Sequence, residues 1–341
     1  MIAAGGTAGH VVPAIAVADA LRAEGAAVSF VGGERAEAEL VPKAGYEIDT
    51  INVEGISRTN PLKAARAVGK AAGAVQTARR ILKRRRADAV LGGGGYVAGP
   101  VGLAATLMKI PLVLAEADSH LGLANRALAS RARRVCLAFP LEGREDPKYL
   151  VTGRAVPPTY TDRAHARAQL GIGAGETCVL VFGGSLGART INTAAPEAFK
   201  AAPYRIVHVA GTRDFPDLEP PAAHYVLLEY LTPFGIALAA ADAAVARAGG
   251  SVFELAQYGL PAVLIPYPHA SADHQSTNAR WMADRGAALV LPDAELTPER
   301  LRAETDALLD RREEMSAAAS AIAKPDAARD IAAEVLAAAR T

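Results

Sequence analysis

The sequence predicts an α/β protein of two doubly wound domains, and three observations support this fold class. Short apolar runs alternate with longer alanine-rich stretches, a pattern typical of parallel strands joined by crossover helices. The chain has 341 residues, enough for two domains at roughly 150 residues each. Each half also contains a glycine-rich turn between a strand and a helix.

The expected strands are short β-branched or apolar segments. They cover 26–31, 89–91 and 112–114 in the first half, and 177–182, 205–209, 243–245 and 262–265 in the second. A helix through Ile15–Leu21 follows the first glycine-rich turn. From Thr297 onward the pattern is helical. The last amphipathic stretch, 327–339, has no strand after it, so we expect it to pack back onto the first domain.

The boundary between the domains is expected in the segment 141–161, which is rich in proline, glycine and charge. We therefore predict an N-terminal domain of 1–155, completed by a C-terminal helix of 326–341, and a C-terminal domain of 156–325. In the simplest arrangement the two glycine-rich loops face a cleft.

The composition excludes several classes of protein. With 51% hydrophobic residues, intrinsic disorder is excluded as the main state, and a net charge of +1 gives no general attraction to nucleic acid. Cys136 and Cys178 are too far apart for a CxxC motif, so we expect reduced thiols. No signal peptide or membrane span is expected, because the start lacks a basic segment and the apolar stretch 97–115 is interrupted by glycine and proline.

The two glycine-rich loops suit diphosphates. They read Gly5-Gly6-Thr7-Ala8-Gly9-His10 and Gly183-Gly184-Ser185-Leu186-Gly187-Ala188. A helix N-terminus offers unpaired N–H groups, and glycine lets a phosphate approach the backbone closely. Neither loop is a Walker motif or a GxGxxG motif, and each also fits an ordinary tight turn. Glu34, expected at the end of the second strand, keeps an NAD-binding enzyme as an alternative.

His10 follows the first loop directly. A neutral imidazole at a helix start can take a proton from a sugar hydroxyl, which makes His10 a candidate general base. A structural histidine is the alternative.

A second group of polar residues follows the later strands, from Arg247 through Glu254 to Gln275 and Asn278. Glu254, one turn into a helix, can accept two ribose hydroxyls. Gln275 and Asn278 are three residues apart and share a helix face, so they can bond vicinal sugar hydroxyls. A helix-capping glutamate and a solvated polar face are the alternative.

The sequence has no Asp-x-Asp motif and no histidines at the spacing of metal ligands, so no metal and no cofactor is expected. Backbone N–H groups would then stabilise a departing diphosphate.

The segment 58–86 carries many cations, and no acidic residue lies between Gly55 and Ala87. At helical spacing, Lys63, Arg66, Lys70 and Arg84 gather opposite Val68, Val75 and Leu82. Each charge near an anionic leaflet could contribute roughly 1 kcal/mol, so we expect an anionic membrane surface as a partner. An ordinary solvated face is the alternative, and scarce aromatic residues disfavour nucleic acid.

Four motifs in register give the chain a specific resemblance. They are the first loop with Val11-Val12-Pro13, the run Gly92–Pro100, the second loop with Arg189 and Asn192, and His274-Gln275 with Asn278-Ala279. Together they resemble the MurG family, undecaprenyl-diphospho-muramoylpentapeptide β-N-acetylglucosaminyltransferases. The resemblance implies a GT-B fold, UDP-GlcNAc as donor, lipid I as acceptor, inversion at the anomeric carbon and no metal. It also implies a peripheral protein of peptidoglycan synthesis at the cytoplasmic face of the cell membrane.

The resemblance also assigns roles to residues. It makes His10 the general base and places acceptor-side contacts at Thr7, Gly9, Tyr96, Asp118 and Asn125. Donor-side contacts fall on Ser185, Leu231, Arg247, Glu254, Gln275 and Asn278.

Four features depart from the family pattern. Glu254 follows Arg247 one residue sooner than is usual. Ala8 replaces a usual glycine. The family's His-Glu-Gln-Asn run reads Ala115-Glu116-Ala117-Asp118, and its Asn-Pro-x-Arg run reads Arg154-Ala155-Val156-Pro157. A related GT-B enzyme with another lipid or natural-product acceptor, a UDP-GlcNAc epimerase and a non-catalytic UDP-sugar-binding protein therefore stay as alternatives.

Overall fold

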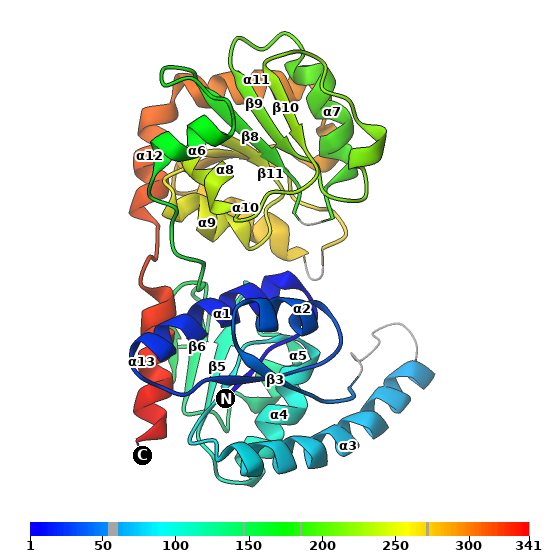
Figure 1. The fold of residues 1–341 in the computed structure, drawn as a ribbon, viewed down its shortest axis with the longest axis vertical. Coiled ribbons are helices and arrows are strands. Elements are labelled where there is room, and N and C mark those ends of the chain that lie inside the picture. The colour runs from blue at the N-terminus through cyan, green and yellow to red at the C-terminus, as the bar shows by residue number, and fades with distance from the viewer. Residues whose placement is uncertain (54–60, 146, 185, 271–272, 341) are drawn as a thin grey trace. The chain divides into compact units, whose positions relative to one another are not determined.

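The computed structural model describes residues 1–53, 61–145, 147–184, 186–270 and 273–340, without the side chains of 61–72. The chain divides into two compact units, Met1–Pro157 with Pro325–Thr341, and Pro158–Lys324 (Figure 1). The division lies between Pro157 and Pro158, whereas the sequence predicts a boundary between residues 155 and 156.

The described strands of the first unit form one seven-stranded parallel sheet in the order β3-β2-β1-β4-β5-β6-β7. The strands are β1 Ile2–Ala3, β2 Ser29–Gly32, β3 Glu47–Thr50, β4 Val90–Gly92, β5 Leu112–Glu116, β6 Arg134–Leu137 and β7 Tyr149–Val151. The strand order reverses between β1 and β4. In doubly wound sheets, ligands bind beyond the carboxyl ends of the strands at this position.

Helices cover both faces of this sheet. Alternate residues of a strand point to opposite faces, and both sets are apolar here, so each face needs a covering layer. Ile2, Phe30 and Leu91 join one buried cluster, whereas their neighbours Ala3 and Val31 join another. The helices of the unit are α1 Ala8–Ala23, α2 Ala36–Lys43, α3 Pro61–Arg85, α4 Gly95–Leu107, α5 Leu123–Leu128 and α13 Ala327–Ala339.

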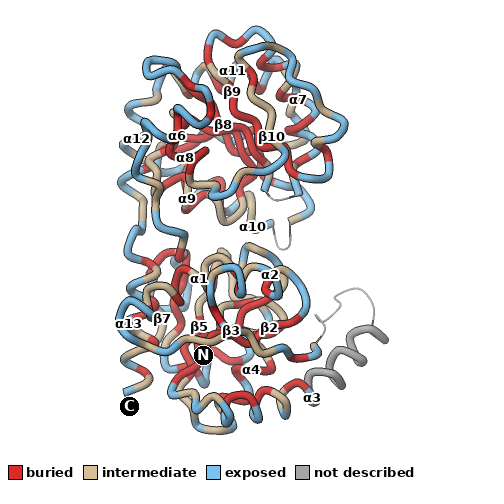
Figure 2. Tube along the Cα trace, in the orientation of Figure 1, coloured by how far each residue is buried: buried red, intermediate tan, exposed pale blue. Residues whose placement is uncertain are grey.

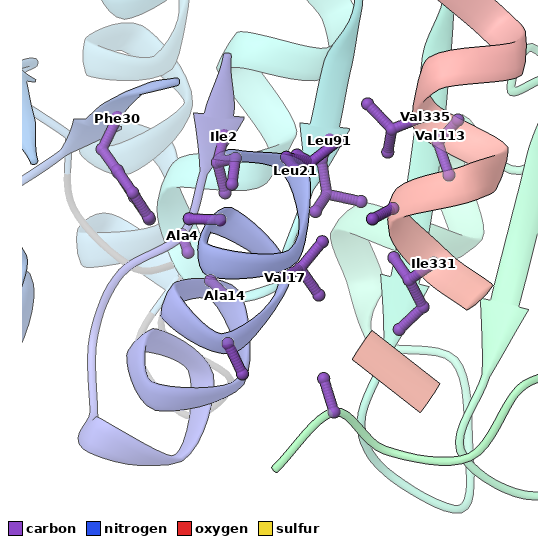
Figure 3. Packing of buried hydrophobic residues seen from close by; sticks show 14 of the residues in the cluster. Ile2, Ala4, Ala14, Val17, Leu21, Phe30, Leu91, Val113, Ile331 and Val335 are labelled. Carbon is purple, nitrogen blue, oxygen red and sulfur yellow. The ribbon is translucent and has the colours of Figure 1, made fainter. Parts of the chain in front are cut away.

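Helix α13 packs against the first unit although it ends the chain. Ile331 and Val335 of α13 join the cluster that contains Val17 of α1 and Val113 of β5 (Figure 3). Burying each of these side chains contributes roughly 1.5–3 kcal/mol, which holds α13 on the sheet.

The expected linker 141–161 is wrong in one part. Tyr149–Val151 forms β7, the edge strand of the first sheet, with Val135 opposite Tyr149. The strand has three residues and one neighbour, so its apolar run is too short to stand out among charge and proline.

The described strands of the second unit form a six-stranded parallel sheet in the order β10-β9-β8-β11-β12-β13. The strands are β8 Cys178–Phe182, β9 Arg205–Val209, β10 Tyr225–Leu228, β11 Ala243–Ala246, β12 Ala262–Leu264 and β13 Ala288–Val290. Here the order reverses between β8 and β11, so both units confirm the predicted doubly wound class.

Figure 2 shows that the central strands of the second unit are buried while its loops are exposed. Val179 and Val181 of β8 pack with Ile191 of α7 and Leu301 of α11. The helices are α6 Arg163–Gln169, α7 Arg189–Phe199, α8 Gly235–Ala240, α9 Ser251–Gln257, α10 His274–Ala283, α11 Pro298–Asp310 and α12 Arg312–Ala321, with 3-10 turns η1 Phe215–Asp217 and η3 Asp293–Glu295.

Helix α3 carries the basic segment. Ala78, Ile81 and Leu82 bury its inner face against the first sheet. Arg84, expected on the free basic face, instead pairs with Asp49 of β3 at 2.5 Å, and Arg85 pairs with the same carboxylate at 2.8 Å. The sequence pattern overlooked this pairing because the acid lies on a distant strand. Arg58 and the side chains of Lys63, Arg66 and Lys70 lie outside the described part.

Among the described residues, no helix combines the length and the apolar character needed to cross a bilayer.

Candidate active site

In the first unit, the loops after β1 and β4 meet at the reversal of strand order. Gly95 has φ +77°, and a Cβ there would lie 1.8 Å from the carbonyl oxygen of Gly5. Only glycine permits this approach. Thr7 caps the start of α1 in an extended conformation, and Thr7 and Gly9 are exposed.

His10 lies in the first turn of α1. Its Nδ1 is buried and makes no hydrogen bond with any described residue, and a Cβ at Gly94 would lie 2.9 Å from that atom. Burial lowers the pKa of His10, the guanidinium of Arg154 lowers it further, and the carboxylate of Asp118 raises it. The imidazole is therefore held toward its neutral form, as a general base requires.

Glu37, which sequence reasoning missed, fixes both glycine loops of the first unit. Its buried carboxylate accepts hydrogen bonds from the Gly6 N–H at 2.8 Å, the Gly33 N–H at 2.9 Å and the Tyr96 hydroxyl at 2.8 Å. These bonds hold the pKa of Glu37 below its usual range despite burial. Glu34, the alternative ribose reader, is exposed three residues earlier.

Tyr96, an expected acceptor-side residue, stands in the first turn of α4. The guanidinium of Arg35 lies 4.9 Å from its ring centroid. Burial and the bond to Glu37 raise the pKa of Tyr96 to about 12, so its hydroxyl stays protonated and donates to the carboxylate.

The segment after β5 is organised around Glu116. Its buried carboxylate accepts from the Gly122 N–H at 2.8 Å, from Asn125 Nδ2 at 2.9 Å and from the Asp118 N–H at 3.2 Å. Burial raises the pKa of Glu116. Asn125 is itself buried and also donates to the Ala115 carbonyl, so its side chain holds the backbone of this segment in place.

In the second unit, the loop after β8 is bound to the loop after β9. Gly187 has φ +77°, and a Cβ there would lie 2.0 Å from the carbonyl oxygen of Ala210. Asn192 of α7 donates to that carbonyl at 2.8 Å. Ser185, the expected phosphate contact, lies outside the described residues.

Arg247 directly follows β11 and is buried. Its guanidinium donates to Asp293 at 2.6 Å, to the Thr190 hydroxyl at 2.8 Å and to the carbonyl of Ile265 at 3.1 Å. These bonds tie α7, β12 and η3 together, which is a framework role. Its expected role toward the donor stays a prediction.

Gln275 and Asn278 both lie on α10, three residues apart, and their expected role toward the sugar stays a prediction. Asn278 is buried and donates to the Ala248 carbonyl at 3.0 Å, which supports the turn before α9. Gln275 accepts from the Tyr267 N–H at 2.9 Å. The prediction that both residues belong to one helix is confirmed, and Asn278 lies on the buried side of α10.

The remaining expected donor residues lie at the carboxyl ends of strands. Glu254 is in the first turn of α9 after β11, and Leu231 follows β10 next to the exposed Tyr230. In the part of the chain that the structure describes, no three His, Cys, Asp or Glu side chains are grouped to hold a metal ion.

Comparison with known proteins gives the class. The glycosyltransferase family 28 N-terminal domain matches residues 1–137, and the glycosyltransferase family 28 C-terminal domain matches residues 178–335. Both units thus have the sequence of a family 28 glycosyltransferase.

Relatives narrow the class further. Proteins from Methylococcus capsulatus and Aeromonas hydrophila are 41% and 40% identical, over 97% and 98% of this chain and 96% and 95% of theirs. Both are named UDP-N-acetylglucosamine--N-acetylmuramyl-(pentapeptide) pyrophosphoryl-undecaprenol N-acetylglucosamine transferase. The crystal structure of Acinetobacter baumannii MurG is similar with a TM-score of 0.79 at 32% identity, over 98% of each chain. The chain belongs to the MurG family.

More distant structures share the fold alone. The glycotransferase of kitacinnamycin has a TM-score of 0.73 at 18% identity, over 99% of this chain and 96% of that one. The expected GT-B fold is confirmed.

Proposed function

We propose that this protein transfers GlcNAc from UDP-GlcNAc to the C4 hydroxyl of MurNAc in lipid I, with inversion and without a metal, and so forms lipid II for peptidoglycan synthesis. The observation that carries this proposal is similarity over nearly the whole chain to enzymes named for this transfer. The half-buried imidazole of His10 beside a glycine-rich helix start supports the proposal, because a neutral imidazole can accept the proton of a sugar hydroxyl.

In the proposed reaction, His10 accepts the proton of the C4 hydroxyl. The hydroxyl oxygen then forms a bond to the anomeric carbon of GlcNAc, and the bond from that carbon to the diphosphate oxygen breaks. UDP leaves with the electron pair, stabilised by N–H groups at the start of α7. Glu254 and Gln275 are proposed to bind the ribose and the GlcNAc hydroxyls, and Leu231 the uracil through its backbone.

The test is transfer to lipid I with His10→Ala as the decisive variant. Purified protein is given UDP-GlcNAc with and without lipid I, and UDP and lipid II are measured. We expect UDP release that depends on lipid I, and a loss of about 10²–10⁴ in turnover for His10→Ala. His165→Ala, an exposed histidine of the second unit, is the matched control.

Two results would contradict the proposal. UDP release that ignores lipid I would favour another acceptor or an epimerase. Near-normal turnover by a folded His10→Ala protein would remove this residue as the base.

We also propose peripheral attachment to the cytoplasmic face of the cell membrane through the basic segment 58–86. Arg79, Arg80 and Lys83 on α3 are exposed, whereas Arg84 and Arg85 are already paired with β3. Replacing Arg79 and Arg80 by Gln removes two charges at roughly 1 kcal/mol each, so it should weaken binding to vesicles containing phosphatidylglycerol about thirtyfold. Equal binding to vesicles of phosphatidylcholine alone would oppose an electrostatic attachment.

A further inference from the structure

Arg154 connects the two backbone segments that precede His10 and Asp118. Its Nη2 donates to the carbonyl oxygen of Gly9 at 2.5 Å, and its Nη1 donates to the carbonyl oxygen of Ala117 at 3.1 Å. Gly9 is the residue before His10, and Ala117 is the residue before Asp118. One guanidinium therefore sets the position of two ionisable side chains.

The sequence of α1 leaves a place for this guanidinium. A helix carbonyl normally accepts from the N–H four residues later, and the residue four after Gly9 is Pro13, which has no N–H. The Gly9 carbonyl is therefore open to a donor from outside the helix, and Arg154 supplies it. Arg154 is placed there by β7, because the Gly153 N–H after that strand bonds to the Leu137 carbonyl at 3.1 Å.

Three other ionisable groups of the first unit belong to the segments around this end of α1: Glu116, Tyr96 and His120. His120 lies in the segment after β5, and its Nδ1 is buried without a hydrogen-bond partner among the described residues. The carboxylate of Glu116 accepts three hydrogen bonds within its own segment, and it lines a cavity of about 20 Å³ together with Arg154. The Tyr96 hydroxyl donates to Glu37. Beside burial, Asp118 and Arg154 are the two charges that act on the imidazole of His10, and they act with opposite sign.

We propose that Arg154 and Asp118 jointly control the protonation of His10. Arg154 is a positioning residue: it holds the start of α1 against the Ala117–Asp118 segment and, as a fixed cation, opposes protonation of the resting imidazole. Asp118 stabilises the imidazolium that forms when His10 takes the proton of the sugar hydroxyl. The catalytic part rests on the proposed function, whereas the titration of His10 is a property of the unliganded protein.

The first experiment measures that titration directly. The full-length protein, labelled with 13C at histidine, is titrated by NMR, and the His10 signal is assigned by its loss in His10→Gln. Arg154→Gln removes a cation and should raise the midpoint of the His10 titration, whereas Asp118→Asn should lower it. Arg154→Lys keeps the charge and should leave the midpoint near that of the parent protein.

The matched control is Arg131→Gln, which removes an exposed arginine of the same unit. It should leave the His10 midpoint unchanged. Opposite shifts in Arg154→Gln and Asp118→Asn support the proposal, because a merely structural role would not reverse sign with the charge removed. An unmoved midpoint in either variant overturns it. If Arg154→Gln fails to fold, Asp118→Asn and Arg154→Lys decide the question in the same way.

The second experiment follows kcat/KM for lipid I against pH. The acidic limb should move upward in Arg154→Gln and downward in Asp118→Asn, and activity below the limb changes about tenfold for each unit of movement. Arg154→Lys cannot span both carbonyls as a planar fork, so it should lower kcat without moving the limb. Unmoved limbs in active enzymes overturn the catalytic part. Absence of transfer by the parent protein would instead contradict the proposed function, and the NMR result would still stand.

Discussion

His208 provides a quantitative prediction about acid stability in the second unit. The imidazole is fully buried in β9, with Nδ1 2.7 Å from the Tyr225 hydroxyl and Nε2 3.0 Å from Asn192 Oδ1. The amide nitrogen of Asn192 already donates to Ala210 and Asp214, so its oxygen faces the imidazole as an acceptor. His208 is therefore neutral, with the proton on Nε2, and the Tyr225 hydroxyl donates to Nδ1.

The magnitude follows from the pKa of His208. Burial lowers it from 6.5 to about 4. Above pH 6.5 the histidine is neutral in both the folded and the unfolded chain, so it has no effect on the pH dependence of stability. Between pH 6.5 and 4 the unfolded chain binds a proton that the folded chain does not. Over 2.5 units at 1.36 kcal/mol each, the second unit loses about 3 kcal/mol of unfolding free energy as the pH falls.

The only tryptophan of the chain makes this loss measurable in the full-length protein. Trp281 lies on α10 in the second unit, with its ring centroid 4.8 Å from that of Phe253, so its fluorescence reports unfolding of that unit. Urea denaturation is followed at several pH values from 7.5 to about 4.5. His208→Gln cannot gain a proton, so its stability should fall less steeply with acid than that of the parent protein.

The comparison cancels groups that titrate in both proteins, since only the difference in slope counts. His165→Gln, which replaces an exposed histidine of the same unit, should keep the parent slope. If His208→Gln loses stability with acid as steeply as the parent protein, the neutral buried imidazole is not the cause, and the account of this network is refuted.

Two further predictions concern the glycine loops. Gly187→Ala puts a Cβ 2.0 Å from the Ala210 carbonyl oxygen at φ +77°, so the loop must shift at a cost of about 1–3 kcal/mol. Titration calorimetry should therefore show an affinity for UDP that is lower by about tenfold or more. Unchanged affinity would show that this loop does not bind the donor. Glu37→Gln replaces one acceptor oxygen by a donor and leaves about 1–3 kcal/mol of hydrogen bonding unmade, so Tm should fall and KM for lipid I should rise. Glu39→Gln, on the exposed side of α2, should change neither.

The central strands and the glycine loops could be predicted because they depend on local patterns. Three of the five residues of Arg205–Val209 are the β-branched Ile206, Val207 and Val209, and the structure assigns all five to β9. The edge strand β3, Glu47–Thr50, contains two acidic residues, and it pairs only on one side, so no apolar pattern marks it. A strand that is half solvated carries little sequence signal.

Site residues could be predicted where they belong to a continuous sequence motif, and not where their partners come from distant segments. His10 directly follows its glycine-rich loop, so the sequence alone makes it a candidate for the general base. Glu37 gains its role only when β2 and α2 bring it against Gly6 and Tyr96, and a lone glutamate in a helix gives no hint of that. The burial of Asn278 likewise depends on which side of α10 faces the turn before α9.

Two of the departures from the family pattern lie close together in the folded first unit. Asp118 stands where an asparagine is usual and adds a negative charge, and Arg154 stands where an asparagine is usual and adds a positive one. In sequence they are 36 positions apart, but the Arg154 guanidinium binds the carbonyl of Ala117, next to Asp118. The two side chains therefore bring charges of opposite sign to act on His10. Because the two single changes move the acidic limb of kcat/KM in opposite directions, Asp118→Asn combined with Arg154→Asn should bring the limb back toward the parent position. A double variant that keeps the full displacement of either single variant would show that the two charges do not oppose each other at His10.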